Sequence, residues 1–541
     1  MGQTSPPPEG VFSLLDTDLY KLTMQCAILK YFPSARMLFY FSNMSGSRHV
    51  PKLRRSRLTR SFPDVTYSFT NRTPDMKFTR RSYNWLLEQI SKLENIKLTE
   101  EELEFLQKCC SYLNPAYLKY LSEFRLKPSE QLEVSFIPID DTGSKDDMGD
   151  VKIAIKGLWV ETILYEIPLL ALTSETYFKF CDRDWDYHQQ EEKAFRKGCA
   201  LLENGCIFSE FGTRRRRDYH TQNLVMEGLT RAAKKGVEEG FKGKFAGTSN
   251  VHFAMKYGID PVGTVAHEWY MGIAAITNNY ENANEIALRY WLGCFGEGVS
   301  LSLSLFFFSF RGIAVAVDAN SMLQVLGIAL TDTFGTPTFL ESFGKPVPEL
   351  TSAEEGPEAT MPSSGINTSE TDSLTSTVPP IQKPFESAAR NTTTKTYAQV
   401  FTGVRQDSGD PIYFLKMAKD FYEKEGIKDK KTVVFSDSLN IELCLEYKVI
   451  AEESGFQPTF GVGTFFTNDF NRTSNGKKSV PLNIVIKVSS AGGRPAVKLS
   501  DNLGKNTGDP KTVVEVKKRL GYVEHDWEDG DETRRWGKKE D

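Results

Sequence analysis

The stretch that decides the fold is TVVFSDSLNIELCLEYKVIAEESGFQPTFGVGTFFTND, residues 432–469. It holds two short apolar runs, and each run ends in a tip of Gly, Ser, Asp and Thr. Between the tips, Ile441–Glu453 is predicted to be a helix. A strand that leads into a polar tip and then a helix is the repeating unit of an α/β barrel. In that fold the carboxyl ends of the parallel strands converge on one site.

The same unit recurs towards the N-terminus of this stretch. One or two such tips would mark only turns, since Gly, Ser and Asp are common turn formers. Seven tips that carry Arg, His and Asp between them favour one shared site. The other five are IFSEFGTRRR (Ile207–Arg216), KFAGTSNV (Lys244–Val251), PVGTVAHEW (Pro261–Trp269), LGIALTDTFGT (Leu326–Thr336) and FTGVRQDSGDP (Phe401–Pro411).

The flanking regions have a different pattern. Leu132–Pro138 alternates like a strand, and so does Val151–Val160. The apolar density of Glu161–Phe178 predicts a mostly buried helix. Leu482–Asn502 predicts a hairpin that turns at Ala491-Gly492-Gly493. Strands are therefore expected at both ends of the chain.

Composition excludes several classes of protein. The 541 residues carry 66 Lys and Arg against 71 Asp and Glu, a net charge of −5. This balance gives no electrostatic reason to expect nucleic acid or an anionic membrane as the main partner. Eight scattered Cys without a CxxC pair argue against zinc ribbons and predict reduced thiols. The N-terminus shows no signal peptide, so we expect a cytoplasmic protein, with the nucleus as an alternative.

Three segments interrupt the pattern. Ser34–Ser61 is basic and has no acidic residue; we expect a solvated loop rather than a nucleic-acid patch. Val299–Gln324 contains the apolar run Leu301–Phe310, which is too short to span a bilayer. Lys345–Thr394 is rich in Ser, Thr, Pro and Glu and is predicted to be a disordered loop.

Several motifs occur together and in a fixed order: DTDLYKLTM (Asp16–Met24), SEFGTRRRR (Ser209–Arg217), GTSNV (Gly247–Val251), GTVAHEW (Gly263–Trp269), LTDTFGT (Leu330–Thr336), VRQDSGDP (Val404–Pro411), FSDSLN (Phe435–Asn440), FGVGTFFTND (Phe460–Asp469) and SDNLGKNTGDP (Ser500–Pro510). As an ordered set they closely resemble the nicotinate phosphoribosyltransferases, of a eukaryotic, fungal kind. The resemblance runs from about Val11 to Trp536, apart from the three interrupting segments.

The resemblance implies a type II phosphoribosyltransferase fold: an irregular α/β barrel with a discontinuous N-terminal α/β, sandwich-like domain, in homodimers. We accordingly divide the chain into a disordered N-terminus (1–10), an N-terminal α/β domain (11–160), a catalytic barrel (161–480), and a C-terminal segment that returns to the N-terminal domain and ends in a loose tail (481–541). The implied reaction converts nicotinate and phosphoribosyl pyrophosphate into nicotinate mononucleotide and pyrophosphate. It is coupled to ATP hydrolysis, uses Mg²⁺ and feeds NAD salvage.

His267 is the residue on which ATP coupling would turn. In the family, the histidine of this motif is phosphorylated by ATP. Imidazole is a competent nucleophile when a partner holds one nitrogen, and Glu268 or a strand-tip carboxylate could be that partner. The alternative is a structural histidine.

The resemblance also assigns the residues that meet the base. Arg405 would recognise the nicotinate carboxylate, because a guanidinium fork matches a carboxylate in two hydrogen bonds. A surface ion pair with Asp407 or Asp410 is the alternative. Tyr20 would stack on the pyridine ring, or else be a core tyrosine, and Thr264 would lie beside the same ring.

The phosphates would meet a second group of residues. Gly463 and Thr464 are typical of a phosphate-binding turn, although a glycine turn without a ligand explains them too. Arg214 and Arg215 are candidates for pyrophosphate or ATP phosphates, whereas Arg216 and Arg217 would be solvated or paired. Asp437 is assigned to phosphoribosyl pyrophosphate, and Asp332 and Asp407 to Mg²⁺; each could instead be a cap or turn residue.

Two of the interrupting segments depart from the family pattern. Phe32-Pro33 recurs as Phe62-Pro63, which suggests the junction of the first insert, 34–61. We hypothesise that this insert, the insert 299–324, or both are translated introns. Reads of a spliced transcript that covered both would refute this.

Other functions fit fewer of the residues. A catalytically impaired homologue that acts as a binding or scaffold protein is one alternative, and intact His267 and Arg405 argue against it. A nicotinamide or quinolinate phosphoribosyltransferase is another. Preference for neutral nicotinamide would contradict the role given to Arg405.

Overall fold

The computed structural model describes residues 8–33, 36–42, 73, 75–296, 307–310, 313–316, 326–348, 395–502 and 506–523, with the backbone alone at 36–42, 307–310 and 313–316. The predicted loop 345–394 and the predicted tail fall almost wholly outside these residues, as do most of the predicted insert 299–324 and of the N-terminal segment 1–10. Within 299–324, a two-stranded hairpin of β7 (Phe307–Phe310) and β8 (Ile313–Ala316) is described.

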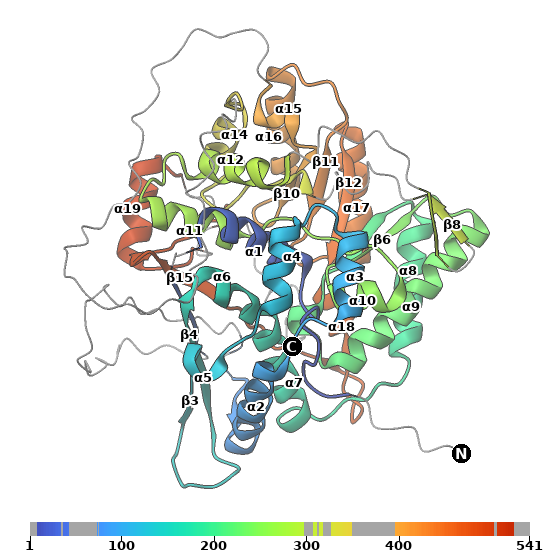
Figure 1. Ribbon diagram of the computed structural model, residues 1–541. Helices are drawn as coiled ribbons and strands as arrows, with labels where there is room; N and C mark the ends of the chain where they lie inside the picture. Colours follow the sequence, from blue (N-terminus) through green and yellow to red (C-terminus); the bar gives the residue numbers. More distant parts are fainter. Residues whose placement is uncertain are drawn as a thin grey trace, which may run out of the picture.

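A six-stranded parallel sheet carries most of the predicted tips (Figure 1). Its order is β6 (Lys244–Thr248), β5 (Ile207–Glu210), β12 (Gln457–Val462), β11 (Thr432–Phe435), β10 (Gly403–Gln406) and β9 (Ile328–Leu330). Six of the seven predicted tips thus follow neighbouring strands. Their carboxyl ends necessarily share one edge of the sheet, because all five pairings are parallel.

Helices connect these strands, as expected of an α/β fold. They are α8 (Gln190–Glu203), α9 (Tyr219–Glu239), α10 (Val251–Tyr257), α11 (His267–Thr277), α12 (Ala283–Phe295), α14 (Thr336–Phe343), α15 (Tyr397–Val400), α16 (Pro411–Lys424), α17 (Ile441–Glu453) and α18 (Thr464–Thr467). The helix predicted at Ile441–Glu453 is confirmed to the residue. The α/β class is confirmed as well.

The sheet is extended beyond β6 but does not close within the described residues. A parallel bridge joins Thr248 to Pro261, and the chain then leads into α11. Between this segment and β9, no strand pairing completes a ring in the part of the chain that the structure describes. The seventh predicted tip therefore joins the sheet through a single bridge, and the described residues form an open parallel sheet.

A second, antiparallel sheet combines both ends of the chain. Its order is β16 (Arg494–Pro495), β15 (Lys487–Ala491), β1 (Arg36–Ser42), β4 (Met148–Leu158) and β2 (Phe78–Thr79), with β3 (Leu132–Pro138) also paired to β4. The β3–β4 hairpin projects from the body of the molecule (Figure 1). The predicted turn at Gly492-Gly493 is confirmed; both glycines have positive φ, 59° and 75°.

The helices around this sheet are α1 (Leu19–Tyr31), α2 (Arg80–Lys92), α3 (Glu100–Cys109), α4 (Pro115–Glu123), α5 (Pro128–Gln131), α6 (Trp159–Thr162), α7 (Glu166–Phe180) and α19 (Pro510–Leu520). The single helix predicted at Glu161–Phe178 is instead divided: α6, a short 3₁₀ turn and then α7. Pro168 lies in the first turn of α7, where its missing N–H costs nothing. A short β13–β14 ribbon (Phe470–Asn471 with Lys478–Ser479) completes the strands.

The expectation that all of 34–61 forms a solvated loop is wrong for its first part. Arg36–Ser42 is β1 and pairs with β4 on one side and β15 on the other. Its sequence, RMLFYFS, is rich in aromatic and apolar residues, which favour a strand inside a sheet. The basic remainder, 43–61, lies outside the described residues.

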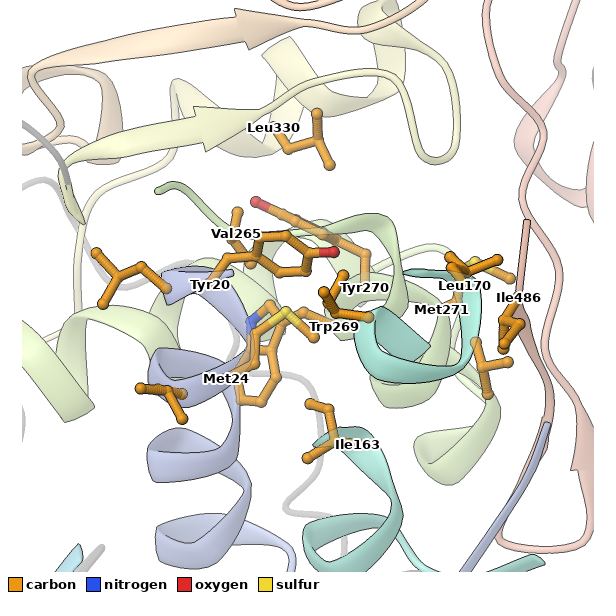
Figure 2. Packing of buried hydrophobic residues seen from close by; sticks show 14 of the residues in the cluster. Tyr20, Met24, Ile163, Leu170, Val265, Trp269, Tyr270, Met271, Leu330 and Ile486 are labelled. Atoms are coloured by element: carbon orange, nitrogen blue, oxygen red, sulfur yellow. The ribbon is translucent and has the colours of Figure 1, made fainter. Parts of the chain in front are cut away.

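The core between the two sheets is built around aromatic residues. Trp159 and Trp269 are fully buried, with ring centroids 5.9 Å apart. Figure 2 shows Tyr20 and Met24 of α1 packed against Trp269 and Tyr270 of α11, with Leu330 of β9 nearby. This packing fixes the N-terminal helix against the segment that carries His267. Among the described residues, no helix combines the length and apolarity needed to cross a membrane.

Candidate active site

A cavity of about 270 Å³ opens at the carboxyl ends of the parallel strands. The loops after β5, β6, β10, β11 and β12 contribute to its wall, and the start of α1 and the strand β15 close it from the second sheet. Such an edge is where ligands bind in α/β folds, because several loops converge there. The predicted site residues that line it are Tyr20, Arg214, Arg215, Thr264, His267, Arg405, Asp407, Asp437, Gly463 and Thr464.

His267 is the first residue of α11, and its imidazole contacts three side chains. Nδ1 lies 3.0 Å from Thr333 Oγ1. Nε2 lies 3.0 Å from Asp407 Oδ2 and 2.8 Å from Lys498 Nζ. Burial and the neighbouring charge of Lys498 lower the pKa of His267 below its ordinary value. The ring is therefore neutral at pH 7 and keeps the lone pair that a nucleophile needs.

Of the carboxylates considered as partners of this histidine, the structure selects Asp407. Glu268 points elsewhere: its Oε2 accepts from Lys21 Nζ at 2.5 Å and its Oε1 from Trp159 Nε1 at 2.8 Å. Lys21 is fully buried and also pairs with Glu166. Glu268 thus belongs to a buried charge network that joins α1 to α11. Although Glu268 is adjacent to His267 in sequence, it does not hydrogen-bond to the imidazole; its carboxylate oxygens accept from Lys21 and Trp159 instead.

Arg405 is held in place by three side chains. Its Nε donates to Ser436 Oγ at 2.8 Å, Nη1 to Thr264 Oγ1 at 3.1 Å and Nη2 to Asp407 Oδ1 at 2.7 Å. A guanidinium has five N–H donors, so one N–H on each terminal nitrogen remains after these contacts. Arg405 therefore forms the ion pair with Asp407 that was predicted as its alternative role. It also keeps two N–H groups that can donate to a ligand in the cavity.

Asp407 links the histidine to the arginine. Burial opposes ionisation of its carboxyl, but the Arg405 guanidinium and His267 outweigh burial and hold its pKa well below the usual range. Ser436 Oγ donates to the same Oδ1 at 2.7 Å. The anion is thus fixed between the two groups on which the predicted function depends.

Asp332 does not line the cavity but lies directly behind the imidazole. It is fully buried, its Oδ2 is 3.1 Å from Lys498 Nζ, and Ser408 donates to it as well. Burial disfavours its ionised form, yet Lys498 and His267 outweigh burial and lower the pKa of Asp332. This carboxylate therefore anchors the lysine that contacts His267.

The pair Asp332 and Asp407, predicted to hold Mg²⁺, converges with His267 so that one ligand atom of each lies within 4.8 Å of the others. The donor set does not fit a resident Mg²⁺. Mg²⁺ requires several oxygen ligands at about 2.1 Å, whereas here Lys498 already neutralises one carboxylate and Arg405 the other. The third group is the imidazole of His267, a nitrogen ligand whose Nε2 already lies 2.8 Å from the Lys498 ammonium.

Tyr20 and Thr264 flank the Arg405 end of the cavity. Tyr20 is 6% exposed, and burial raises the pKa of its phenol well above the ordinary value. Its hydroxyl has no hydrogen-bond partner among the described residues. The guanidinium carbon of Arg214 lies 5.3 Å from the centre of its ring. Tyr20 is thus both part of the core, as Figure 2 shows, and part of the cavity wall.

Gly463 and Thr464 line the cavity where β12 runs into α18. A side-chain carbon at Gly461 would lie 2.5 Å from the Phe211 ring, and one at Gly463 would lie 3.0 Å from the Phe211 carbonyl oxygen. Both glycines are therefore required by the close approach of the loop after β5. Nearby, Ser438 beside Asp437 has a φ of 51°, a conformation rare for serine.

The four consecutive arginines divide between the cavity and the core. Arg214 lines the cavity, 3.6 Å from Glu166 and 3.8 Å from Asp18, and Arg215 also lines it. Arg216 and Arg217 are buried rather than solvated. Arg216 forms an ion pair with Asp16, and Arg217 donates to Asn468 Oδ1 at 2.9 Å.

Sequence reasoning missed several residues of the site. Lys498 and Thr333 contact His267 and Ser436 contacts Arg405, yet none of the three was assigned a role; among their neighbours in sequence, only Asp332, next to Thr333, and Asp437, next to Ser436, had been assigned one. Thr333 and Ser436 belong to quoted motifs, and Lys498 lies two residues before the motif that begins at Ser500; this proximity was the available signal. What the motifs could not show is that Lys498 reaches His267 across 231 residues of sequence.

Comparison with known proteins gives the same assignment along the chain. A model of the nicotinate phosphoribosyltransferase (NAPRTase) family matches residues 206–351 and 372–524, and a model of the NAPRTase N-terminal domain matches residues 58–174. The second match begins close to Phe62, where the first insert was predicted to end.

Individual relatives cover nearly the full length. A nicotinate phosphoribosyltransferase of Saccharomyces cerevisiae is 40% identical over 97% of this chain and 98% of its own. That of Methanosarcina acetivorans is 32% identical over 92% and 95%.

Solved structures resemble the chain too. One from Saccharomyces cerevisiae gives a TM-score of 0.73 at 38% identity, covering 96% of this chain and 100% of the other. A nicotinate phosphoribosyltransferase from Porphyromonas gingivalis gives 0.66 at 28%, covering 94% and 100%. The chain therefore belongs to the nicotinate phosphoribosyltransferase family.

Proposed function

We propose that this chain transfers the phosphoribosyl group of phosphoribosyl pyrophosphate to nicotinate and couples this transfer to ATP hydrolysis. The observation that supports it most is the arrangement of Arg405. Two guanidinium N–H groups remain for a ligand after three side chains have fixed the arginine, and a carboxylate is the anion that such a fork accepts in two hydrogen bonds. An uncharged amide would form a weaker pair there.

Bound by its carboxylate, the pyridine ring would lie beside Tyr20 and Thr264. The ring nitrogen needs no base, because it attacks C1′ of the ribose through its own lone pair. The new N–C1′ bond forms as the C1′–O bond to pyrophosphate breaks, and pyrophosphate leaves. Catalysis then rests on holding the two reactants in line and on balancing the leaving charge.

His267 would supply the coupling to ATP. Its neutral imidazole could take the terminal phosphoryl group, so that an N–P bond forms and the P–O bond to ADP breaks. Water would later cleave the phosphohistidine and return the imidazole. Asp407, hydrogen-bonded to both His267 and Arg405, connects the phosphorylated group to the base-binding group.

The phosphates would meet Gly463, Thr464, Asp437, Arg214 and Arg215, which all line the cavity. Mg²⁺ stays part of the proposal, as a cation that shields phosphate charge. Because Asp332 and Asp407 are already paired with cations, we expect it to enter with the phosphates. A homodimer and a cytoplasmic location stay predictions.

The test is incubation with nicotinate, phosphoribosyl pyrophosphate and ATP labelled at the terminal phosphate. We expect the wild type to form nicotinate mononucleotide and to carry acid-labile label. His267→Ala should lose the label and the ATP dependence while keeping a slow ribosyl transfer. A wild type that binds nicotinate but forms no mononucleotide would overturn the proposal.

A further inference from the structure

Lys498 contacts the central histidine and has no role in the proposal so far. Its side chain is 9% exposed. Nζ lies 2.8 Å from His267 Nε2 and 3.1 Å from Asp332 Oδ2. Lys498 also lines the cavity, so the same ammonium faces the imidazole, a buried carboxylate and the space for ligand.

The chemistry of the ammonium determines where the proton of the imidazole is. An ammonium has three N–H donors and no lone pair, so it can only donate. Nε2 must then be the accepting nitrogen of the neutral ring. The ring proton is left on Nδ1, which donates to Thr333 Oγ1 at 3.0 Å.

Asp407 favours the opposite state of the same nitrogen, with the proton on Nε2. Its Oδ2 lies 3.0 Å from Nε2 and, as a carboxylate, can only accept. If Lys498 moved away, the proton would be more favourable on Nε2, where it could be donated to Asp407. Nδ1 would then accept from the Thr333 hydroxyl, which can either donate or accept. Both forms of the ring thus have partners, and Lys498 decides between them.

The backbone holds the two sides of this arrangement together. The amide of Leu499, next to Lys498, donates to the carbonyl oxygen of Thr333 at 2.8 Å. Lys498 itself pairs with Thr507 through two backbone hydrogen bonds of 2.9 Å. The lysine and the threonine therefore keep a fixed spacing on either side of the imidazole, and only the lysine side chain can change partner.

We propose that Lys498 is a positioning residue that keeps the proton of His267 on Nδ1 in the resting protein and that a phosphate-bearing ligand reverses this by drawing the ammonium away from Nε2. The ring stays neutral throughout: one proton leaves Nδ1 and one joins Nε2. The second half rests on the proposed function, because it requires phosphates in this cavity. The first half, which places the resting proton on Nδ1, does not rest on the proposed function.

The experiment is ¹⁵N NMR of the full chain labelled at histidine, in which pyrrole-like and pyridine-like nitrogens are distinguished directly. The chain has six histidines, and His267→Gln assigns the signal. We expect wild-type His267 to be protonated on Nδ1 without ligand and on Nε2 with inorganic pyrophosphate. In Lys498→Met, which keeps the length but removes the charge, we expect the proton on Nε2 with or without pyrophosphate.

Lys487→Met is the matched control, since Lys487 lines the same cavity and donates to Thr507 rather than to His267. Its resting spectrum should match the wild type. Protonation of wild-type Nε2 without ligand, or of Nδ1 in Lys498→Met, would overturn the proposal. Should Lys498→Met fail to fold, the wild-type titration decides: an unchanged His267 signal at millimolar pyrophosphate contradicts the second half.

Failure here is distinguishable from failure of the proposed function. A chain that forms no mononucleotide can still show the expected resting proton and its dependence on Lys498. An active enzyme can equally show the proton on Nε2. The spectra without ligand therefore test the lysine, and the product assay tests the reaction.

Discussion

Two arginine–aspartate ion pairs in this molecule differ in burial and in the role that we assign to them. Arg216 and Asp16 meet in two hydrogen bonds of 2.7 and 2.8 Å, and both side chains are 0% exposed. Arg405 and Asp407 meet in one hydrogen bond, with side chains 12% and 22% exposed, at the wall of a cavity. The first pair is sealed inside the fold, whereas the second keeps donors for a ligand.

The difference shows how burial separates a structural charge pair from a functional one. A sealed pair contributes to holding the segment before α1 against the loop after β5, and losing one member leaves an uncompensated charge in the core. A cavity pair is held by neighbouring hydroxyls, so losing one member changes what can bind more than whether the chain folds. Four variants can break or sharpen this contrast.

The largest effect is expected for Arg216→Met. It leaves Asp16 buried without its cation; among the side chains that the structure describes, the amide of Asn250, at 2.8 Å, is the one that still donates to it. We expect a loss of about 3–5 kcal/mol in the free energy of unfolding, measured by denaturant titration. A loss below about 1 kcal/mol would show that this pair is not structural in the sense proposed.

Arg405→Met should have the opposite profile. It removes the fork for the carboxylate, so we expect kcat/KM for nicotinate to fall about 100-fold, the equivalent of one strong charged hydrogen-bond pair. Stability should fall by less than in Arg216→Met, because Ser436 and His267 still contact Asp407. Equal losses for nicotinate and nicotinamide in steady-state assays would contradict the assignment.

Gly461→Ala tests the packing that shapes the cavity wall. The new methyl group would lie 2.5 Å from two carbons of the Phe211 ring, so the ring or the strand must shift. We expect a cost of about 1–3 kcal/mol in unfolding free energy and a higher KM for phosphoribosyl pyrophosphate. Gly296→Ala is the control, because within the described part of the chain its methyl group would meet nothing closer than 3.7 Å, and φ is −72°.

The size of the effect of Glu175→Gln depends on pH. Burial and then the charge of Asp218 raise the pKa of Glu175 to about 8. The folded state therefore binds a proton that the unfolded chain releases near pH 4.5, and stability falls as pH rises between these values. The amide cannot ionise, so the variant should be more stable than wild type at pH 9 and as stable as wild type at pH 4. Parallel stability curves from pH 4 to 9 would contradict this.

Much of the fold was predictable from local pattern. Short apolar runs with polar tips predicted the strands of the parallel sheet, and the helix at Ile441–Glu453 was placed to the residue. The strand Arg36–Ser42 was missed, because the basic character of the longer segment hid a seven-residue run suited to a sheet. The division of Glu161–Phe178 at the 3₁₀ turn Ile163–Tyr165 was missed because apolar density does not report where a helix begins.

The sequence predicted which residues line the site but not which of them contact one another. The ordered motifs led us to expect His267, Arg405 and Thr464 at one site, and all three line the same cavity. Which carboxylate contacts His267 could not be predicted, because Glu268 is adjacent in sequence and Asp407 is adjacent in space. The same holds for the four arginines: local sequence gives each the same charge, and only long-range packing makes Arg216 a core residue and Arg214 a cavity residue.

The central claim is that this cavity is built for a small carboxylate-bearing ring. The most direct test is the rate at which the wild type converts nicotinate and nicotinamide, each with saturating phosphoribosyl pyrophosphate and ATP. We predict that kcat/KM for nicotinate exceeds that for nicotinamide by about 100-fold or more, because only nicotinate accepts both remaining N–H groups of Arg405. Equal or faster conversion of nicotinamide would contradict the account.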